Sequence, residues 1–223
     1  MSDQLAQVAP TPLAVAPGPS LAAHIAVGGV SGLAWGAGLR GYMAEMVGAE
    51  SVVSWGGTVL AVLLPAGVTG ALPGWAEYLR RTGGRPHWRL LALAPLVLAV
   101  APLLMPGAVV ALVTQGLGGG AIAFAAIGIG GGFALSGRGK ARWRALCGVV
   151  ALILVAGIAA TPAGIGGPDL ALSTPRGVWV ALLGLTSGAT LAIASSIPQR
   201  RTAWTGPTPT TDAGGWSARG GVA

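Results

Sequence analysis

Three ionisable residues beside the first apolar stretch are the best candidates for chemistry in this sequence. Arg40, Glu45 and Glu50 lie close together in the chain. Two carboxylates beside a cation could perform acid–base catalysis on a lipid, and the cation could also bind an anionic headgroup or substrate. Ionisable groups near hydrocarbon tend to pair, so we expect Glu45 or Glu50 to fold back and neutralise Arg40. We therefore predict an ion cluster at the outer face of a membrane, and we favour a salt bridge over a binding site.

A second pattern in the same stretch is the recurrence of glycine every four residues, at Gly28, Gly32 and Gly36. A helix turns about 100° per residue, so these three positions stay within about 80° of one another and form one smooth groove. Small residues of this kind let two helix backbones approach closely. The pattern predicts a helix-packing groove, and we favour packing inside one chain over a dimer interface.

The usual catalytic motifs do not occur in the sequence. It has no Gly-x-x-x-x-Gly-Lys-Ser/Thr loop, no His-Glu-x-x-His, no Cys/His cluster with metal-ligand spacing and no Gly-x-Ser-x-Gly elbow. We therefore predict no catalytic residue, no cofactor and no metal site. No charged residue lies near the middle of an apolar stretch, whereas ion-coupled transporters usually need one there. The polar residues at depth are neutral: Ser31, Thr58, Thr186, Ser187 and Thr190.

The amino-acid composition indicates that most of this chain lies in a membrane. Hydrophobic residues make up 53% of the chain, charged residues 9%, and the mean hydropathy is +0.72. Soluble domains carry about 25% charged residues, which excludes an ordinary water-soluble fold. Helices of about 20 apolar residues span the hydrocarbon core of a bilayer. The sequence predicts an all-α bundle of about six transmembrane helices over 21–39, 51–72, 90–104, 117–135, 145–163 and 177–197.

This prediction divides the chain into three parts. Residues 1–20 are rich in Pro and Ala and are expected to form a flexible tail, 21–197 form the six-helix transmembrane domain, and 198–223 form a disordered cytoplasmic tail. The third apolar stretch is the shortest, and whether it fully spans stays open.

The basic residues predict the orientation in the membrane. Eleven of the thirteen Lys and Arg fall in 80–89, in 138–144 and from 200 onward. Cytoplasmic loops carry an excess of such residues, which places all three clusters and both termini in the cytoplasm of a plasma-membrane protein. The net charge of +7 is then explained by topology and by anionic headgroups at the inner face, with no nucleic acid as partner.

One segment resembles a known family. Arg40-x-Tyr42-Met43, followed by Ser54-Trp55-x-Gly57-Thr58, is similar to a pattern in a family of uncharacterised bacterial multi-pass membrane proteins. The resemblance covers residues 28–72, and Tyr42 stands where Trp is more usual. It implies a shared fold and carries no activity to this chain, while the excess of Arg over Lys, with abundant Ala, Gly and Val, predicts a bacterial source.

Three functions remain open on these observations. The first is a non-catalytic component that packs, assembles or binds a membrane-protein partner or a second copy of itself, and we favour it because the chain has glycine-lined helices and no buried titratable group. The second is a permease or channel for a small neutral solute, which Pro65, Pro95 and Pro102 would support by kinking their helices. The third is a lipid-acting membrane enzyme at Arg40.

Overall fold

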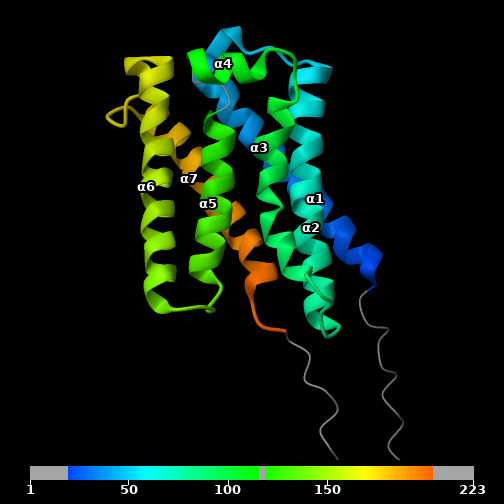
Figure 1. Ribbon diagram of the computed structural model, residues 1–223. Helices are drawn as coiled ribbons and strands as arrows, with labels where there is room; N and C mark the ends of the chain where they lie inside the picture. The colour runs from blue at the N-terminus through cyan, green and yellow to red at the C-terminus, as the bar shows by residue number, and fades with distance from the viewer. Residues whose placement is uncertain (1–19, 116–118, 203–223) are drawn as a thin grey trace, which may run out of the picture.

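The chain folds into a bundle of helices that run alternately between two ends (Figure 1). The computed structural model describes residues 20–115 and 119–202, and it contains no strand within those ranges. The predicted tails lie largely outside them, at 1–19 and 203–223.

Each predicted apolar stretch falls on a helix. The elements are α1 (Leu21–Val47) with a 3-10 turn (Gly48–Glu50), a π-helical segment (Trp55–Leu63) that continues into α2 (Leu64–Arg81), a 3-10 helix (Trp88–Leu93) that continues into α3 (Pro95–Leu103), α4 (Ala108–Gln115), α5 (Gly119–Leu135), α6 (Ala141–Gly166), a 3-10 turn (Pro168–Leu170), and α7 (Pro175–Ser196) with a 3-10 turn (Ile197–Gln199). The short α4 was not predicted, and the segment predicted as a disordered tail from residue 198 begins with this last turn.

Short-range chemistry explains where the helices begin and end. The side chain of Ser20 caps α1 by accepting from the backbone N–H of Ala23, and Thr174 caps α7 in the same way from Gly177. Helix α1 continues past its predicted end at residue 39, because no Gly or Pro with a helix-breaking conformation occurs before Gly48, whose φ of 63° belongs to the left-handed region. Arg40 therefore lies inside the helix.

Within the described residues, four helices are long and apolar enough to cross a membrane: Leu21–Glu50, Trp55–Arg81, Ala141–Gly166 and Pro175–Gln199. The remaining two predicted spans are shorter. Helix α5 has 17 residues, and α3 is bent from α4 by 107° at the break between them. Pro102 and a left-handed Gly107 lie close to that break, where the chain cannot continue as a straight helix.

The core connects five of the helices. Helix α1 packs chiefly against α2, while α5 packs against both α6 and α7. Buried apolar side chains from α1, α3, α5, α6, α7 and the Pro168–Leu170 turn form the main cluster: Leu39, Tyr42, Leu98, Phe124, Ile127, Ile158, Leu170, Val180 and Leu191.

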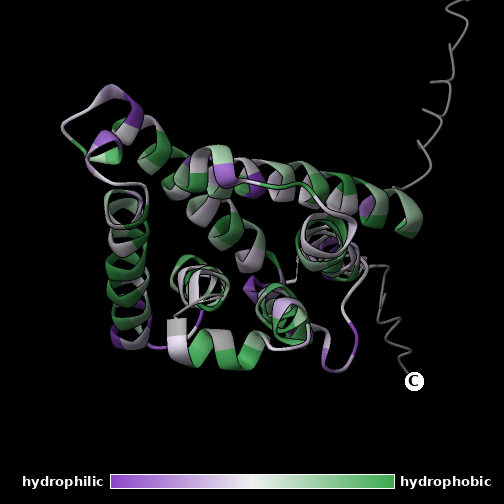
Figure 2. Ribbon diagram, turned by 90° about the horizontal axis from the view of Figure 1, so that it is seen from above, coloured by the Kyte–Doolittle hydropathy of each residue, from purple (hydrophilic) through white to green (hydrophobic). Residues whose placement is uncertain are grey.

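The outward faces of the helices are apolar as well. Figure 2, which looks down on the bundle of Figure 1 from above, shows hydrophobic colouring over much of the helix surface. On α6, Leu152 and Ile153 are 70% and 65% exposed. Water disfavours large exposed apolar patches, whereas hydrocarbon favours them, so this surface is typical of a helix bundle in a membrane.

The three basic loops lie at the same end of the bundle. In Figure 1 the turn after α2, the loop between α5 and α6, and the chain after α7 all lie at the bottom, and α4 lies across the top. Arg89, Arg138 and Arg201, one from each cluster, line one shared concavity. We call this the basic end of the bundle and the other the opposite end.

Candidate functional site

Arg40 organises the loop that joins α1 to the π-helical segment. Its guanidinium is half-buried and donates from Nη2 to Ser51 Oγ (2.9 Å) and to the Val52 carbonyl (2.8 Å). Its Nε lies 3.4 Å from Thr58 Oγ1. The cation therefore holds two groups of the connecting loop and contacts one residue of the π-helical segment, at the opposite end of the bundle.

In the predicted ion cluster of Arg40, Glu45 and Glu50, the expected ion pair between Arg40 and either glutamate is wrong. Glu45 Oε2 accepts from Nη2 of Arg176, at the start of α7, at 3.0 Å. Because α1 continues as a helix, Arg40 and Glu45 are rotated by about 140° from each other and lie on different faces. Glu50 follows in the 3-10 turn and is exposed, and no ion pair joins it to Arg40 among the described residues.

The Glu45–Arg176 pair contributes little to stability. Their side chains are 41% and 54% exposed. Exposed pairs of this kind are worth about 0.2–1 kcal/mol. The pair connects the C-terminal part of α1 to the start of α7 at the opposite end of the bundle.

The Ser-Trp-x-Gly-Thr segment at residues 54–58 is a local hydrogen-bonded unit. Ser54 Oγ accepts from the Gly57 N–H (3.0 Å), and the Ser54 N–H lies 3.3 Å from Thr58 Oγ1. These reciprocal bonds satisfy backbone donors at the start of the π-helical segment, as a capping box does. With Arg40 on Thr58, the Arg and Ser-Trp-x-Gly-Thr motifs form one structural unit. The family resemblance itself stays a prediction.

Tyr42 has a separate role in the core. It is 2% exposed, and its hydroxyl donates to the Ile158 carbonyl on α6 at 2.9 Å. Pro162 lies four residues further along α6 and has no N–H, so it cannot supply the usual intrahelical donor to that carbonyl. Tyr42 therefore satisfies an acceptor that the proline leaves without its helical partner.

The predicted glycine groove faces α2 of the same chain. A side chain on Gly28 would collide with the carbonyl of Gly70, and one on Gly32 with the carbonyl of Ala66. A Cβ on Gly36 would lie 2.5 Å from the Cβ of Ala66. The matching stripe on α2 was missed, although Ala66, Gly70 and Gly74 show the same four-residue spacing in the sequence.

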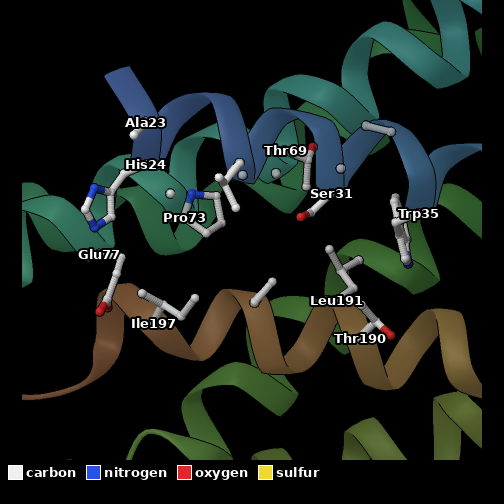
Figure 3. A pocket seen from close by; sticks show the side chains of 17 residues that line it. Ala23, His24, Ser31, Trp35, Thr69, Pro73, Glu77, Thr190, Leu191 and Ile197 are labelled. Atoms are coloured by element: carbon white, nitrogen blue, oxygen red, sulfur yellow. The ribbon is translucent and has the colours of Figure 1, made fainter. Parts of the chain in front are cut away.

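A cavity of about 480 Å³ runs beside this contact, between α1, α2 and α7 (Figure 3). Its walls carry mainly small and aliphatic residues, among them Gly28, Pro73, Leu191 and Ala194. We call it the α1/α2/α7 groove. No single stretch of sequence signals it, because three segments far apart in the chain form its walls.

Two polar groups deep in the groove are already hydrogen-bonded to the protein. Trp35 Nε1 donates to the Ser187 carbonyl on α7 (2.9 Å), and Thr69 Oγ1 donates to the Ala94 carbonyl (3.3 Å). The first bond connects α1 to α7 at the end of the groove farthest from the basic end. These groups therefore present mainly their apolar atoms to an occupant.

Charged groups lie only at the rim of the groove, toward the basic end. Glu77 accepts from Nε of both Arg80 and Arg81, at 2.6 Å each. His24 lies across from it in Figure 3, with Nδ1 3.0 Å from the Ser20 carbonyl and its ring edge-on to Tyr78. The groove is thus charged at one end and mainly apolar along the rest of its length.

Among the described residues, no group of three or more His, Cys, Asp or Glu is placed to hold a metal ion. No family model, curated protein or solved structure matches the chain. The function must therefore be inferred from the geometry of the groove and of the basic end.

Proposed function

We propose that this chain is a six-span protein of the plasma membrane with both termini in the cytoplasm. Four helices have the full length and hydropathy for this. The two shorter spans come close to the hydrocarbon thickness of about 30 Å. Helix α5 is about 26 Å long, and α3 with its preceding 3-10 helix is about 25 Å long, because a 3-10 helix rises about 2 Å per residue. The basic end would face the cytoplasm, in agreement with the distribution of Arg.

The proposed topology is tested by cysteine labelling in a Cys147→Ser background. Thr82→Cys at the basic end and Asp169→Cys at the opposite end are both exposed positions. A membrane-impermeant maleimide applied to intact cells should label the Asp169 variant and leave the Thr82 variant unlabelled until the membrane is permeabilised. Equal labelling of both before permeabilisation would contradict the topology.

The function that this geometry supports best is the non-catalytic binding of a membrane amphiphile, with its hydrocarbon chain in the α1/α2/α7 groove. The observation that carries this proposal is the shape and polarity of the groove: it is mainly apolar along its length, where its polar side chains are neutral, and charged only at the rim. An amphiphile from the inner leaflet has the same arrangement, with a polar headgroup at the interface and a chain in the hydrocarbon.

The length and lining of the groove suit a hydrocarbon chain. From His24 to Trp35 the groove follows α1 for eleven residues, or about 17 Å. Its walls are mainly apolar along that length. Packed carbon atoms are about 4 Å apart, so small wall residues such as Gly28 and Ala194 let an extended chain lie close against the helices.

The two alternatives have less support. A permease would need a continuous path, and the bond between Trp35 and Ser187 joins α1 to α7 across the far end of the groove. A lipid-acting enzyme would need Arg40 and Glu45 together, and these residues contact different partners.

The groove is tested with a photoactivatable phosphatidylglycerol that carries a diazirine in its chain. Thr190 lines the groove, whereas Ile193 on the same helix is 55% exposed and does not line it. We expect Thr190→Phe to fill the groove and reduce labelling of groove peptides severalfold, and Ile193→Phe to leave that labelling unchanged. Groove labelling that survives Thr190→Phe, or that never exceeds labelling of the outer faces, would contradict the proposal.

A further inference from the structure

The concavity at the basic end is formed by three segments that are far apart in the sequence. It encloses about 510 Å³ and is lined by Arg89, Gly137, Arg138, Gly139, Arg201 and Thr202. Each arginine comes from a different basic cluster, and each is held by its own local structure.

Arg89 is positioned by a buried tryptophan. Its guanidinium carbon lies 5.6 Å from the ring centre of Trp88, which is 7% exposed and packs with Ala76 and Leu79. A Cβ on Gly84 would lie 3.1 Å from Trp88 Nε1 and 3.6 Å from Thr202 Cγ2, so the turn that precedes Trp88 approaches the chain after α7 closely. The stacked ring limits the directions in which Arg89 can point.

Arg138 lies between two glycines in the loop that joins α5 to α6. Gly137 and Gly139 have φ values of 72° and 84°, which residues with a side chain rarely adopt. The N–H of Arg138 donates to the hydroxyl of the buried Ser136 at 3.1 Å. The hydrogen bond to Ser136 and the two left-handed glycines thus fix the loop backbone around Arg138.

Arg201 follows a well-anchored end of α7. Pro198 is fully buried, and Gln199 Nε2 lies 3.3 Å from the Ser195 carbonyl. The backbone of Arg200 is extended, and its side-chain Nη2 donates to Ser196 Oγ at 2.9 Å. Arg201 comes next and lines the concavity together with Thr202.

We propose that Arg89, Arg138 and Arg201 form a binding site for an anionic phosphate group. Three arginine residues line one concavity and concentrate positive charge there, and the planar fork of a guanidinium matches the oxygens of a phosphate. The phosphate belongs to the headgroup of an inner-leaflet lipid or to a soluble phosphate compound, and the two share this chemistry. The proposal does not depend on an occupant in the α1/α2/α7 groove.

Topology alone does not account for this arrangement. The positive-inside rule requires basic residues in the cytoplasmic loops, but it does not require them to line one concavity. Arg142 satisfies the same rule without lining the site, and it lies 5.7 Å from the ring of Trp143, which is 52% exposed. Arg142 therefore serves as a matched control for Arg89: each lies near the start of a helix at the basic end and beside the ring of a neighbouring tryptophan, but Arg142 lies outside the site.

The test uses the full chain in phosphatidylcholine nanodiscs. One arm measures retention of added phosphatidylglycerol by native mass spectrometry, and the other measures binding of radiolabelled inorganic phosphate by equilibrium dialysis. Arg89→Gln, Arg138→Gln and Arg201→Gln should each weaken binding by about tenfold, the effect of losing one charge-assisted contact. Arg142→Gln should change it less than about twofold. Arg138→Lys keeps the charge and loses the fork, so it should also weaken binding.

The outcomes distinguish the two sources of phosphate. Retention of phosphatidylglycerol alone would identify a lipid headgroup, and binding of inorganic phosphate as well would identify a site open to soluble phosphate. An equal loss in Arg142→Gln, full binding in Arg138→Lys, or no binding in either arm would overturn the proposal. Variant folding is checked by an unchanged melting temperature. The groove experiment detects the hydrocarbon chain of the lipid and not its phosphate. Failure of the groove proposal can therefore be distinguished from failure of the phosphate-site proposal.

Discussion

Replacing Gly32 with alanine tests the close contact between α1 and α2. The added Cβ would collide with the Ala66 carbonyl and would lie 2.9 Å from the Gly70 Cα. Ordinary Cβ contacts are 3.4–4 Å, so the backbones must move apart by at least about 0.5 Å. Both neighbours are backbone atoms of α2, which cannot rotate away as a side chain can. The cost should lie at the upper end of the usual range for overpacking, at about 3 kcal/mol.

Gly38 on the same helix provides the control. A Cβ there meets nothing within 4 Å. Both substitutions gain about the same helix propensity, at most about 1 kcal/mol, so this gain cancels when the two variants are compared. In a domain of this size 1 kcal/mol corresponds to about 2–4 °C, so Gly32→Ala should melt about 6–12 °C below Gly38→Ala.

The assay is thermal unfolding in detergent at several protein concentrations. A difference between the variants that is independent of concentration is expected, because the contact lies within one chain. Melting temperatures within about 2 °C of each other would refute the packing argument. A difference that grows on dilution would instead place the glycine groove between two copies of the chain.

Two further predictions follow from hydrogen bonds in the structure. Tyr42→Phe should lower the free energy of unfolding by about 1 kcal/mol. The loss should be smaller in a Pro162→Ala background, because residue 162 then regains an N–H for the Ile158 carbonyl. A double-mutant cycle with zero coupling between the two substitutions would contradict this. Arg40→Gln should release the loop that Arg40 binds and increase amide hydrogen exchange across residues 51–58 severalfold, whereas unchanged exchange there would show that the loop is held by other contacts.

The positions of the helices could be predicted from the sequence because hydrocarbon accepts only long apolar runs. Their ends were harder to place. The prediction ended the first stretch at residue 39, next to the charged Arg40, yet a single arginine does not break a helix, and α1 continues to Val47. The short α4 was missed because it has only eight residues, of which six are apolar, and it follows Pro106 and Gly107, so the segment looks like part of a loop.

The pairing of charges was beyond a reading of one sequence. Glu45 and Arg176 are 131 positions apart, and nothing local to either indicates the other. The error with Arg40 had a different cause, since helical rotation separates residues five positions apart. The α2 stripe of Ala66, Gly70 and Gly74 could have been found from its spacing. The groove and the basic concavity could not, because each needs three segments placed in space.

The most direct test of the central claim is the depth at which a lipid chain labels the groove. Two phosphatidylglycerol probes would be compared, one with a diazirine next to the headgroup and one with a diazirine at the chain end. The first should label peptides near His24 and Glu77, and the second should label those near Trp35 and Leu191, which lie at the rim and in the depth of the groove. Labelling by both probes that is confined to the outer face of α6, around Leu152, would contradict the account.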